Sequence, residues 1–478
     1  MTRDGEEPPP AESAELTPAV TGSTQSTSTG AESTPTVTIA ESTPTVAAST
    51  PTVAVVGAGA VGATTALDLA GYGVDVTLFE RESVDDRDVD SAPSSLDTTS
   101  SSPDTASTRA AGVLYDAYAE DVDAALGGFA LDRFREFAAT DGFRFTFHDC
   151  PYAILVRAGD EERASATRRA VERMQSHGRA VETVSPETLG DRFPSLVTDD
   201  LAVAAVAENA GWADTVAFVA AVRGAARDAG VTVRDETTVS LDPDGTTFDA
   251  VVVAAGAHTP QVVGSAGLPI KPYRVQALTT RVEPEDDPTA ARGSPHPGPM
   301  WYDATVGVYA RPHPTGLLAG DGTVPSEADP DEWDRTADDW FREETIAVVD
   351  HRLGRRVESD DVTDDERRDK RHEENPERHE TVETAWAGLC TATPDGDPLL
   401  GRVSAGLYVA AGWQGHGFMR APAHAAVVAA LVADDLGVAD ADPASLPGGE
   451  TALSAFDPTR FPDDVTFDVR EGMVIETE

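Results

Sequence analysis

The feature that most constrains the fold is the stretch of residues 52–80, TVAVVGAGAVGATTALDLAGYGVDVTLFE. Its apolar start, residues 53–56, is typical of a strand that is buried on both faces. Gly57, Gly59 and Gly62 follow in the pattern GxGxxG. The first glycine allows the tight strand-to-helix turn, the second lets the backbone approach a pyrophosphate, and the third lets the helix pack closely on the sheet.

A second strand is predicted over Val74–Phe79, and it ends in Glu80, 18 positions beyond Gly62. A carboxylate at this place accepts hydrogen bonds from ribose hydroxyls and would repel a 2′-phosphate. Because the strand, the helix N-terminus and the acidic residue all fit, the segment predicts a bound dinucleotide. By itself the pattern leaves FAD and NAD open.

The charge of the chain excludes several classes of function. It carries 84 acidic and 36 basic residues, for a formal net charge of −48, and Lys271 and Lys370 are its only lysines. Such a chain is repelled by phosphate backbones and by anionic membranes, so we expect no nucleic-acid partner. The sequence contains no apolar run of about 18 residues, so we expect no membrane span. High acid content with almost no lysine resembles proteins of salt-loving archaea.

Cysteine usage and the N-terminus indicate the compartment. Cys150 and Cys390 are the only cysteines and no CxxC motif is present, which excludes a disulfide scaffold and favours a reducing compartment. The first residues, MTRDGEEPPP, contain no apolar stretch, so no secretory signal is expected. We therefore expect a cytoplasmic protein, and no spacing of histidines or cysteines predicts a metal site.

Low-complexity segments interrupt the chain. Residues 1–51 consist mainly of Thr, Ser, Pro, Ala, Glu and Gly and are expected to form a disordered tail; STPTV occurs at residues 33–37 and 42–46, and a third copy at 49–53 runs into the first buried strand. Residues 82–108, 283–299 and 359–380 are expected as surface loops or exposed helix. Residues 441–478 are interpreted as an acidic C-terminal extension.

Two later segments carry further motifs. FDAVVVAAGAHTP, residues 248–260, predicts another buried strand that ends in a glycine turn. Residues 386–436 begin WAGLCTATPDGDPLLG and continue with GLYVAAGWQGHGF, which predicts a strand, a glycine-rich loop and a long helix. With these segments in this order, roughly residues 52–461 resemble the D-amino-acid oxidase-like superfamily of FAD-dependent amine and amino-acid oxidoreductases. Sarcosine oxidase, glycine oxidase and dimethylglycine dehydrogenase are the members that the chain resembles most.

The resemblance implies an α/β fold, in which a Rossmann-like FAD-binding domain carries an inserted α+β substrate domain with a mixed sheet. The FAD-binding domain is expected from residues 52–140, 209–268 and 384–440. The substrate domain is expected from residues 141–208 and 269–383.

The resemblance also implies a set of cofactor-binding residues. In the family, the loop that corresponds to residues 412–418 lies by the flavin pyrimidine edge, and the helix after it stabilises negative charge on reduced flavin. Arg109 corresponds to an arginine against the ring in sarcosine oxidase, although a salt bridge in this acidic protein is the alternative. The residues expected to contact FAD are Gly57, Gly59, Gly62, Glu80, Arg109, Val239, Ala255, Gly256, Gly412, Gly415, His416, Gly417 and Phe418.

Non-covalent FAD is expected. No histidine stands beside Arg109, and the attachment cysteine of sarcosine oxidase aligns with Gly388. The implied reaction oxidises the C–N bond of an amino acid or secondary amine by hydride transfer to flavin N5, with oxygen or an electron carrier as final acceptor. Two alternatives stay open, an FAD-dependent 2-hydroxy-acid dehydrogenase and a non-catalytic flavoprotein subunit of a larger complex.

The substrate-binding residues depart from the family pattern. Gly112, Cys390 and Met419 stand where relatives carry cations that hold the substrate carboxylate. Arginine is therefore the main cation left for that task, since it holds a carboxylate with two hydrogen bonds. The candidates for the substrate pocket are Tyr309, Arg311 and Arg420, with packing or structural roles as their alternatives.

Overall fold

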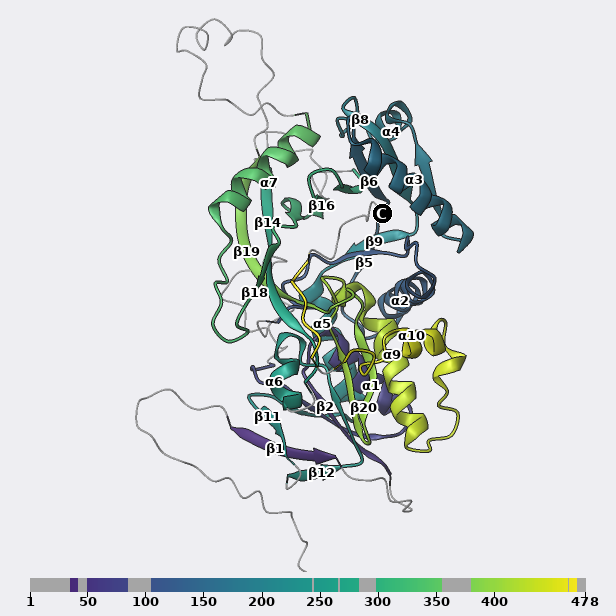
Figure 1. Cartoon of the computed structure of the whole chain (residues 1–478), viewed down its shortest axis with the longest axis vertical. Coiled ribbons are helices and arrows are strands. Elements are labelled where there is room, and N and C mark those ends of the chain that lie inside the picture. The colour runs from purple at the N-terminus through teal and green to yellow at the C-terminus, as the bar shows by residue number, and fades with distance from the viewer. Residues whose placement is uncertain are drawn as a thin grey trace, which may run out of the picture. The chain divides into compact units, whose positions relative to one another are not determined.

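The computed structural model describes one unit, which begins at Pro35 (Figure 1). The described residues are 35–41, 50–84, 105–242, 245–264, 267–282, 298–354, 380–462 and 464–470. Most of the predicted low-complexity stretches therefore lie outside the described residues, as do Lys370 and the last eight residues of the predicted C-terminal extension.

A six-stranded sheet carries the glycine-rich turn, with strand order β10-β3-β2-β13-β21-β20. Its strands are β2 (Thr52–Val56), β3 (Asp75–Phe79), β10 (Thr232–Arg234), β13 (Ala250–Val253), β20 (Leu399–Ser404) and β21 (Leu407–Ala411). All neighbours are parallel except β20 and β21. Segments from three distant parts of the sequence thus assemble into one sheet, as the strand pattern predicts.

Both faces of this sheet are covered. On one face, Val53 and Val55 of β2 pack in a core with three helices, α1 (Ala60–Gly71), α5 (Thr215–Asp228) and α9 (Gly417–Asp435). On the other face, Ala54 and Val56 pack in a second core. This double burial explains why β2 is an uninterrupted apolar run. Helix α2 (Asp121–Ala139) lies against α9.

The second core contains a strand that the sequence analysis missed. β1 (Thr36–Glu41) pairs in parallel with β11 (Thr238–Leu241) and with β12 (Thr246–Phe248) (Figure 1). Ile39 is fully buried there. The expected disorder of residues 1–51 is therefore wrong for residues 36–41. The reason is the buried isoleucine, whose burial stabilises a strand that the surrounding Ser, Thr and Pro concealed.

A nine-stranded mixed sheet forms the second large element, with order β18-β14-β17-β16-β15-β6-β8-β7 and β19 paired to β14. Its strands are β6 (Tyr152–Arg157), β7 (Val181–Val184), β8 (Leu201–Ala207), β14 (Lys271–Val282), β15 (Met300–Asp303), β16 (Val308–His313), β17 (Gly316–Gly320), β18 (Val324–Glu327) and β19 (Glu380–Ala392). Only β6 and β15 run parallel to each other among the paired neighbours of this sheet. Its associated helices are α3 (Glu161–Ser176), α4 (Pro186–Arg192) and α7 (Asp339–Arg352).

Smaller elements join the two sheets. A three-stranded sheet consists of β4 (Val113–Tyr115), β5 (Phe147–Asp149) and β9 (Ala210–Ala213). The remaining helices are η2 (Gly256–His258), α6 (Thr259–Val263), η4 (Pro443–Ser445) and α10 (Gly449–Ala455). The expected fold class is confirmed, whereas the expected domain boundaries stay a prediction.

Neither a membrane-spanning helix nor a metal-binding cluster is found among the described residues. No helix in these ranges is both long enough and apolar enough to cross a membrane. The same ranges contain no group of three or more His, Cys, Asp or Glu side chains placed to hold a metal ion.

Candidate functional site

A cavity of about 520 Å³ begins at the carboxyl ends of β2, β3 and β13 and reaches the long pair β14–β19. The carboxyl ends of parallel strands are where open α/β sheets bind ligands. We call the part around Gly57, Gly59 and Glu80 the nucleotide end. We call the part around Tyr309 and Cys390 the sheet end.

The glycine-rich turn has the close packing that its sequence predicts. Gly57 has a φ of +103°, which favours glycine, and a Cβ there would lie 2.5 Å from the carbonyl oxygen of Ala254. A Cβ on Gly62 would lie 1.9 Å from the carbonyl oxygen of Gly57. Gly57 and Gly59 line the cavity, whereas Gly62 supports the turn from behind.

Glu80 lies at the nucleotide end and is 8% exposed. Its Oε2 accepts a 2.8 Å hydrogen bond from the backbone N–H of Ala58, inside the glycine-rich turn. The other backbone group of Ala58, its carbonyl, accepts a hydrogen bond from Nε of Arg223 at 2.7 Å. Arg223 is 1% exposed on α5 and was not expected at the site. The only sequence feature that could have indicated its role is that it is an arginine within the apolar pattern of a helix.

Three further predicted residues, from two other segments, also line the nucleotide end. They are Val239 from β11, and Ala255 and Gly256 after β13. Arg81 lies beside them and pairs with Asp331 at 2.8 Å.

An acidic residue of the loop between β18 and α7 closes this end. Asp331 accepts hydrogen bonds from Arg81 at 2.8 Å and from Gln261 at 3.0 Å. The ring Nε2 of His258 lies 3.1 Å from the same carboxylate. The hydrogen bond from Gln261, ahead of that from Arg81, holds the pKa of Asp331 below its usual value. The carboxylate of Asp331 thus contacts residues from two other segments that are far apart in the sequence, and no short motif predicts these contacts.

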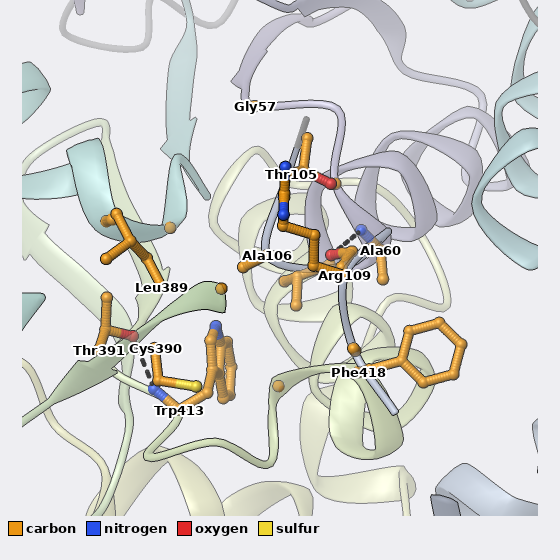
Figure 2. Close-up of a pocket in the computed structure, with 18 of the residues that line it drawn as sticks. Gly57, Ala60, Thr105, Ala106, Arg109, Leu389, Cys390, Thr391, Trp413 and Phe418 are labelled. Carbon is orange, nitrogen blue, oxygen red and sulfur yellow. Dashed lines mark hydrogen bonds between the residues drawn. The ribbon is translucent and has the colours of Figure 1, made fainter. Parts of the chain in front are cut away.

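The segment from Thr105 to Gly112 crosses the N-terminus of α1. Ser107 Oγ accepts a hydrogen bond from the Ala60 N–H at 3.0 Å. Arg109 donates to the Ala387 carbonyl at 2.9 Å, and its guanidinium lies 5.8 Å from the ring centroid of Trp333. Figure 2 shows Arg109 on the cavity together with Ala60 of α1 and Leu389 of β19. Arg109 therefore ties the segment that crosses α1 to β19 of the nine-stranded sheet at the cavity wall.

The sheet end is formed by the paired strands β14 and β19. Their register places Tyr273 opposite Cys390 and Ala277 opposite Trp386, and all four line the cavity. Tyr309 of β16 completes this wall. Burial, followed by nearby Asp321 and Cys390, raises the pKa of Tyr309 well above its usual value. Its hydroxyl is therefore neutral.

Two further aromatic rings, one from β4 of the small sheet and one from β6 of the nine-stranded sheet, line the same cavity. Tyr115 and Tyr152 are stacked with ring centroids 4.9 Å apart, and both line the cavity. Neither was expected at the site. Because β4 and β6 belong to different sheets, only the tertiary fold brings the two tyrosines together.

Two predicted substrate residues, Arg311 and Arg420, do not line the cavity. Arg311 is 5% exposed, and it donates to the carbonyl of Ala111 and lies 4.6 Å from the Trp212 ring centroid. Burial lowers its pKa to about 10. It shares a face of β16 with Tyr309 but lies further along the strand, beneath the segment at Ala111.

Arg420 is committed to the helix interface between α9 and α2. Its guanidinium pairs with Asp123 at 3.1 Å and lies 5.0 Å from the ring centroid of Tyr118. The Arg420 side chain is 8% exposed. Its place in the first turn of α9 directs it toward α2, which the sequence spacing alone does not reveal.

The loop before α9 divides into residues on the cavity and residues behind it. Gly415, Gly417 and Phe418 line the cavity, whereas Gly412 and His416 do not. His416 lies edge-to-face with Tyr118 at 6.4 Å. Burial, followed by the charge of Arg420, lowers the pKa of His416 to about 3, so its ring is neutral.

Arg335 is a cation at the cavity that the sequence analysis missed. With Arg81 and Arg109 it is one of three arginines that line the cavity among the described residues. Its guanidinium lies 4.7 Å from the Trp333 ring centroid. Trp333 therefore has an arginine close to it from each of two segments, Arg109 and Arg335.

Comparisons with known proteins agree with this architecture. A model of the DAO family, described as FAD dependent oxidoreductase, matches residues 52–431. L-proline dehydrogenase from P. horikoshii is 22% identical, with a TM-score of 0.65, over 86% of this chain and 98% of that chain. Glycine oxidase from Geobacillus kaustophilus is 21% identical, with a TM-score of 0.64, over 86% and 100%. Iminodiacetate oxidase from Chelativorans sp. BNC1 is 20% identical, with a TM-score of 0.59, over 80% and 95%. No curated protein matches the sequence.

Proposed function

The chain belongs to the DAO family of FAD-dependent oxidoreductases, and from this premise we propose that it oxidises the C–N bond of an amino acid or secondary amine. The observation that carries the proposal is that one cavity joins the nucleotide end to the aromatic sheet end. A small molecule held at the sheet end then shares a cavity with the cofactor. The enzymes of similar fold act, by their names, on proline, glycine and iminodiacetate, which supports the proposal by analogy.

The nucleotide end fits FAD. The turn at Gly57 and Gly59 leaves no room for a side chain at Gly57, so backbone lines this part of the cavity beside the N-terminus of α1. That arrangement suits a pyrophosphate. Glu80 supplies a buried carboxylate for ribose hydroxyls. When bound, FAD supplies the two-electron acceptor for substrate oxidation.

We propose that Arg109, Gly415, Gly417 and Phe418 contact the ring end of FAD, since all four line the cavity beyond the turn. Val239, Ala255 and Gly256 are proposed to contact the nucleotide half. Gly62, Gly412 and His416 then act indirectly, by supporting the turn and the loop from behind.

We propose that FAD is held without a covalent bond. Cys390 is the one cysteine on the cavity among the described residues. Burial raises the pKa of its thiol to about 12, so the nucleophilic thiolate is not formed at neutral pH. Gly388 has no side chain that could attach. Flavin should therefore be released in full when the protein is denatured.

The proposed substrate binds between the aromatic wall and Trp333. Tyr115, Tyr152 and Tyr309 offer apolar surface with neutral hydroxyls, which suits an uncharged amine carrying an aliphatic part. The substrate carboxylate is proposed to bind Arg335, with Arg109, which is also close to Trp333, contributing positive charge. Arginine has five N–H donors, so it can keep a protein contact and still bind a carboxylate.

The reaction needs few catalytic groups besides the residues that orient the substrate. Oxidation removes a hydride, which is two electrons and a proton, from the substrate carbon and leaves an iminium ion, which water hydrolyses to a carbonyl compound and an amine with release of a proton. An amine bound in neutral form needs no dedicated base. The residues of this chain therefore hold the substrate, exclude bulk water and place its α-carbon within the cavity.

Steady-state turnover with a reducible dye tests the proposal. Candidate substrates are N-methyl amino acids, proline, D-amino acids and 2-hydroxy acids. We expect dye reduction with amines, together with the carbonyl product and the released amine. Turnover of 2-hydroxy acids alone would favour the alternative of a 2-hydroxy-acid dehydrogenase, which oxidises a C–O bond. Turnover with none of them would favour a non-catalytic flavoprotein subunit.

We further propose that an electron carrier, rather than oxygen, reoxidises the enzyme. Lys271 does not line the cavity, and its Nζ donates instead to the Phe467 carbonyl at 2.8 Å. Lys271 therefore does not supply a positive charge at the cavity that would assist the reduction of oxygen. Anaerobic and aerobic dye turnover at equal rates would support the carrier.

We also propose a cytoplasmic enzyme of a salt-rich cell. The two reduced cysteines and the acidic, lysine-poor sequence support this proposal.

A further inference from the structure

Gln414 combines two unfavourable features at the edge of the cavity. It lies between Trp413 and Gly415 and has a φ of +49°, a left-handed conformation that a residue other than glycine adopts infrequently. Its side chain is buried, at 6% exposure, and lines the cavity. Strained residues of this kind persist where the surrounding structure holds them, and they concentrate at ligand sites.

The backbone around Gln414 is fixed by β19. The N–H of Gln414 donates to the Thr391 carbonyl at 2.9 Å, and the N–H of Trp413 donates to Thr391 Oγ1 at 3.2 Å. Figure 2 shows the second of these bonds, with Cys390 beside it on the cavity. The position of Gln414 is therefore set by the same strand that lines the sheet end.

The C-terminal segment fixes the side chain of Gln414. The amide Nε2 donates to the carbonyl of Arg470 at 2.6 Å. Residues 467–470, which we call the docked tail, are held by Lys271 through the Phe467 carbonyl and by Val469, which packs against Tyr273. Because Arg470 offers a carbonyl, only the NH₂ group of Gln414 can bond to it. The amide oxygen must then point the other way.

That oxygen, Gln414 Oε1, is buried and has no hydrogen-bond partner among the described residues. Leaving a buried acceptor without a donor is unfavourable, and native proteins seldom do so. Because Gln414 lines the cavity, a buried and oriented acceptor without a donor on its side chain indicates a ligand with a donor at this place. The second cavity glutamine near the sheets, Gln276, differs because its amide oxygen accepts from the Asp338 N–H at 2.6 Å.

The ligand donor follows from the order of groups along the cavity. Glu80 marks the ribose and the turn at Gly57 marks the pyrophosphate, so the flavin ring is left for the sheet end, where Gln414 lies. The oxidised ring carries one N–H donor, at N3. We propose that Gln414 Oε1 accepts a hydrogen bond from the flavin N3–H, and that the docked tail positions the amide for it. The proposal rests on FAD binding and not on the identity of the substrate.

Titration of the apoprotein with FAD and with N3-methyl-FAD tests the proposal by fluorescence. Wild type is expected to bind N3-methyl-FAD about tenfold more weakly than FAD, because the methyl group removes the donor. Gln414→Met is expected to bind FAD about tenfold more weakly than wild type does. It should then bind the two flavins equally. Gln261→Met, which alters a cavity glutamine at the nucleotide end, should keep the wild-type preference for FAD.

A chain that ends at Val465 tests the docked tail. Without residues 466–478 the preference for FAD over N3-methyl-FAD should shrink toward unity, because the amide of Gln414 loses its anchor. Equal binding of both flavins by wild type would overturn the proposal without any variant. A full preference retained in Gln414→Met or in the shortened chain would also overturn it. A protein that binds neither flavin would overturn FAD binding itself, whereas failure to oxidise amines would leave this result unaffected.

Discussion

The two ends of the cavity are built in different ways. The nucleotide end takes Gly57, Gly59 and Glu80 from 24 consecutive residues, in one strand–helix–strand unit. The sheet end collects residues from β4, β6, β14, β16 and β19, and from the loops before α7 and α9. The first is a local motif with fixed spacing, whereas the second depends on the register of a large mixed sheet. The glycine-rich turn and Glu80 are therefore readable from sequence, and the sheet end is where specificity can vary.

The largest effect is expected from filling the space behind the glycine-rich turn. Gly62→Ala places a Cβ within 1.9 Å of the Gly57 carbonyl oxygen, so backbone must move. We expect a loss of about 3 kcal/mol in the free energy of unfolding and no retained flavin. Gly71→Ala on the same helix is the control, because nothing lies within 4 Å of its new Cβ. Urea unfolding and the visible absorbance of the purified proteins measure both, and equal behaviour of the two variants would contradict the account.

Loss of the buried carboxylate tests the ribose contact. Glu80→Leu removes the acceptor for the Ala58 N–H as well as the proposed ribose contact, so the Kd for FAD should rise about 100-fold. Glu80→Gln keeps a neutral acceptor and should raise the Kd about tenfold. Isothermal titration of the apoprotein gives both values. A wild-type Kd in Glu80→Leu would remove Glu80 from the binding site.

At the sheet end, two arginines should behave in opposite ways. Arg335→Met should raise KM for the carboxylate substrate about 30-fold and leave the Kd for FAD unchanged. Arg311→Met is the matched variant, since Arg311 is buried against Trp212 and does not line the cavity. Arg311→Met should lower the melting temperature of the protein and keep KM within about twofold of the wild-type value. Steady-state kinetics and thermal melts measure this pair, and the reverse pattern would return the anchor to Arg311.

The smallest effect concerns the loop that supports residues 412–418. Burial, followed by Asp123 and Asp395, raises the pKa of Asp397 to about 6. A carboxyl whose pKa is raised in the folded state stabilises the fold at low pH, and this contribution is lost as the pH rises from about 4 through 6. Asp397→Asn should therefore stabilise the protein by about 1 kcal/mol at pH 8, after allowance for solvent screening, and have little effect at pH 4.

Asp395 provides the comparison for that variant. Although burial opposes it, hydrogen bonding by Arg460 holds the pKa of Asp395 below its usual value. The carboxylate form is then the stabilising one, and its contribution is lost as the pH falls. Asp395→Asn should destabilise the protein at pH 8. Urea midpoints measured from pH 4 to pH 8 should diverge for the two variants, and parallel curves would contradict the assignment of opposite shifts.

The sequence predicts those parts of the fold and site that depend on spacing within one unit. The turn at Gly57, the buried strand before it and Glu80 after the next strand required no long-range information. Arg311 and Arg420 could not be placed in this way, because their orientation depends on Ala111 and Asp123 in other segments. Arg335 stands in no motif, and Gln414 lies within the loop of residues 412–418 without being singled out by its pattern. Ile39 shows the same limit for the fold, since its partners are strands about 200 residues later.

Anaerobic addition of an amine substrate to the purified holoprotein tests the central claim most directly. If the cavity joins FAD to an amine site, one equivalent of an amino acid or N-methyl amino acid should bleach the visible flavin absorbance and yield one equivalent of carbonyl product. Bleaching by 2-hydroxy acids alone, or by no compound of either class, would contradict the account.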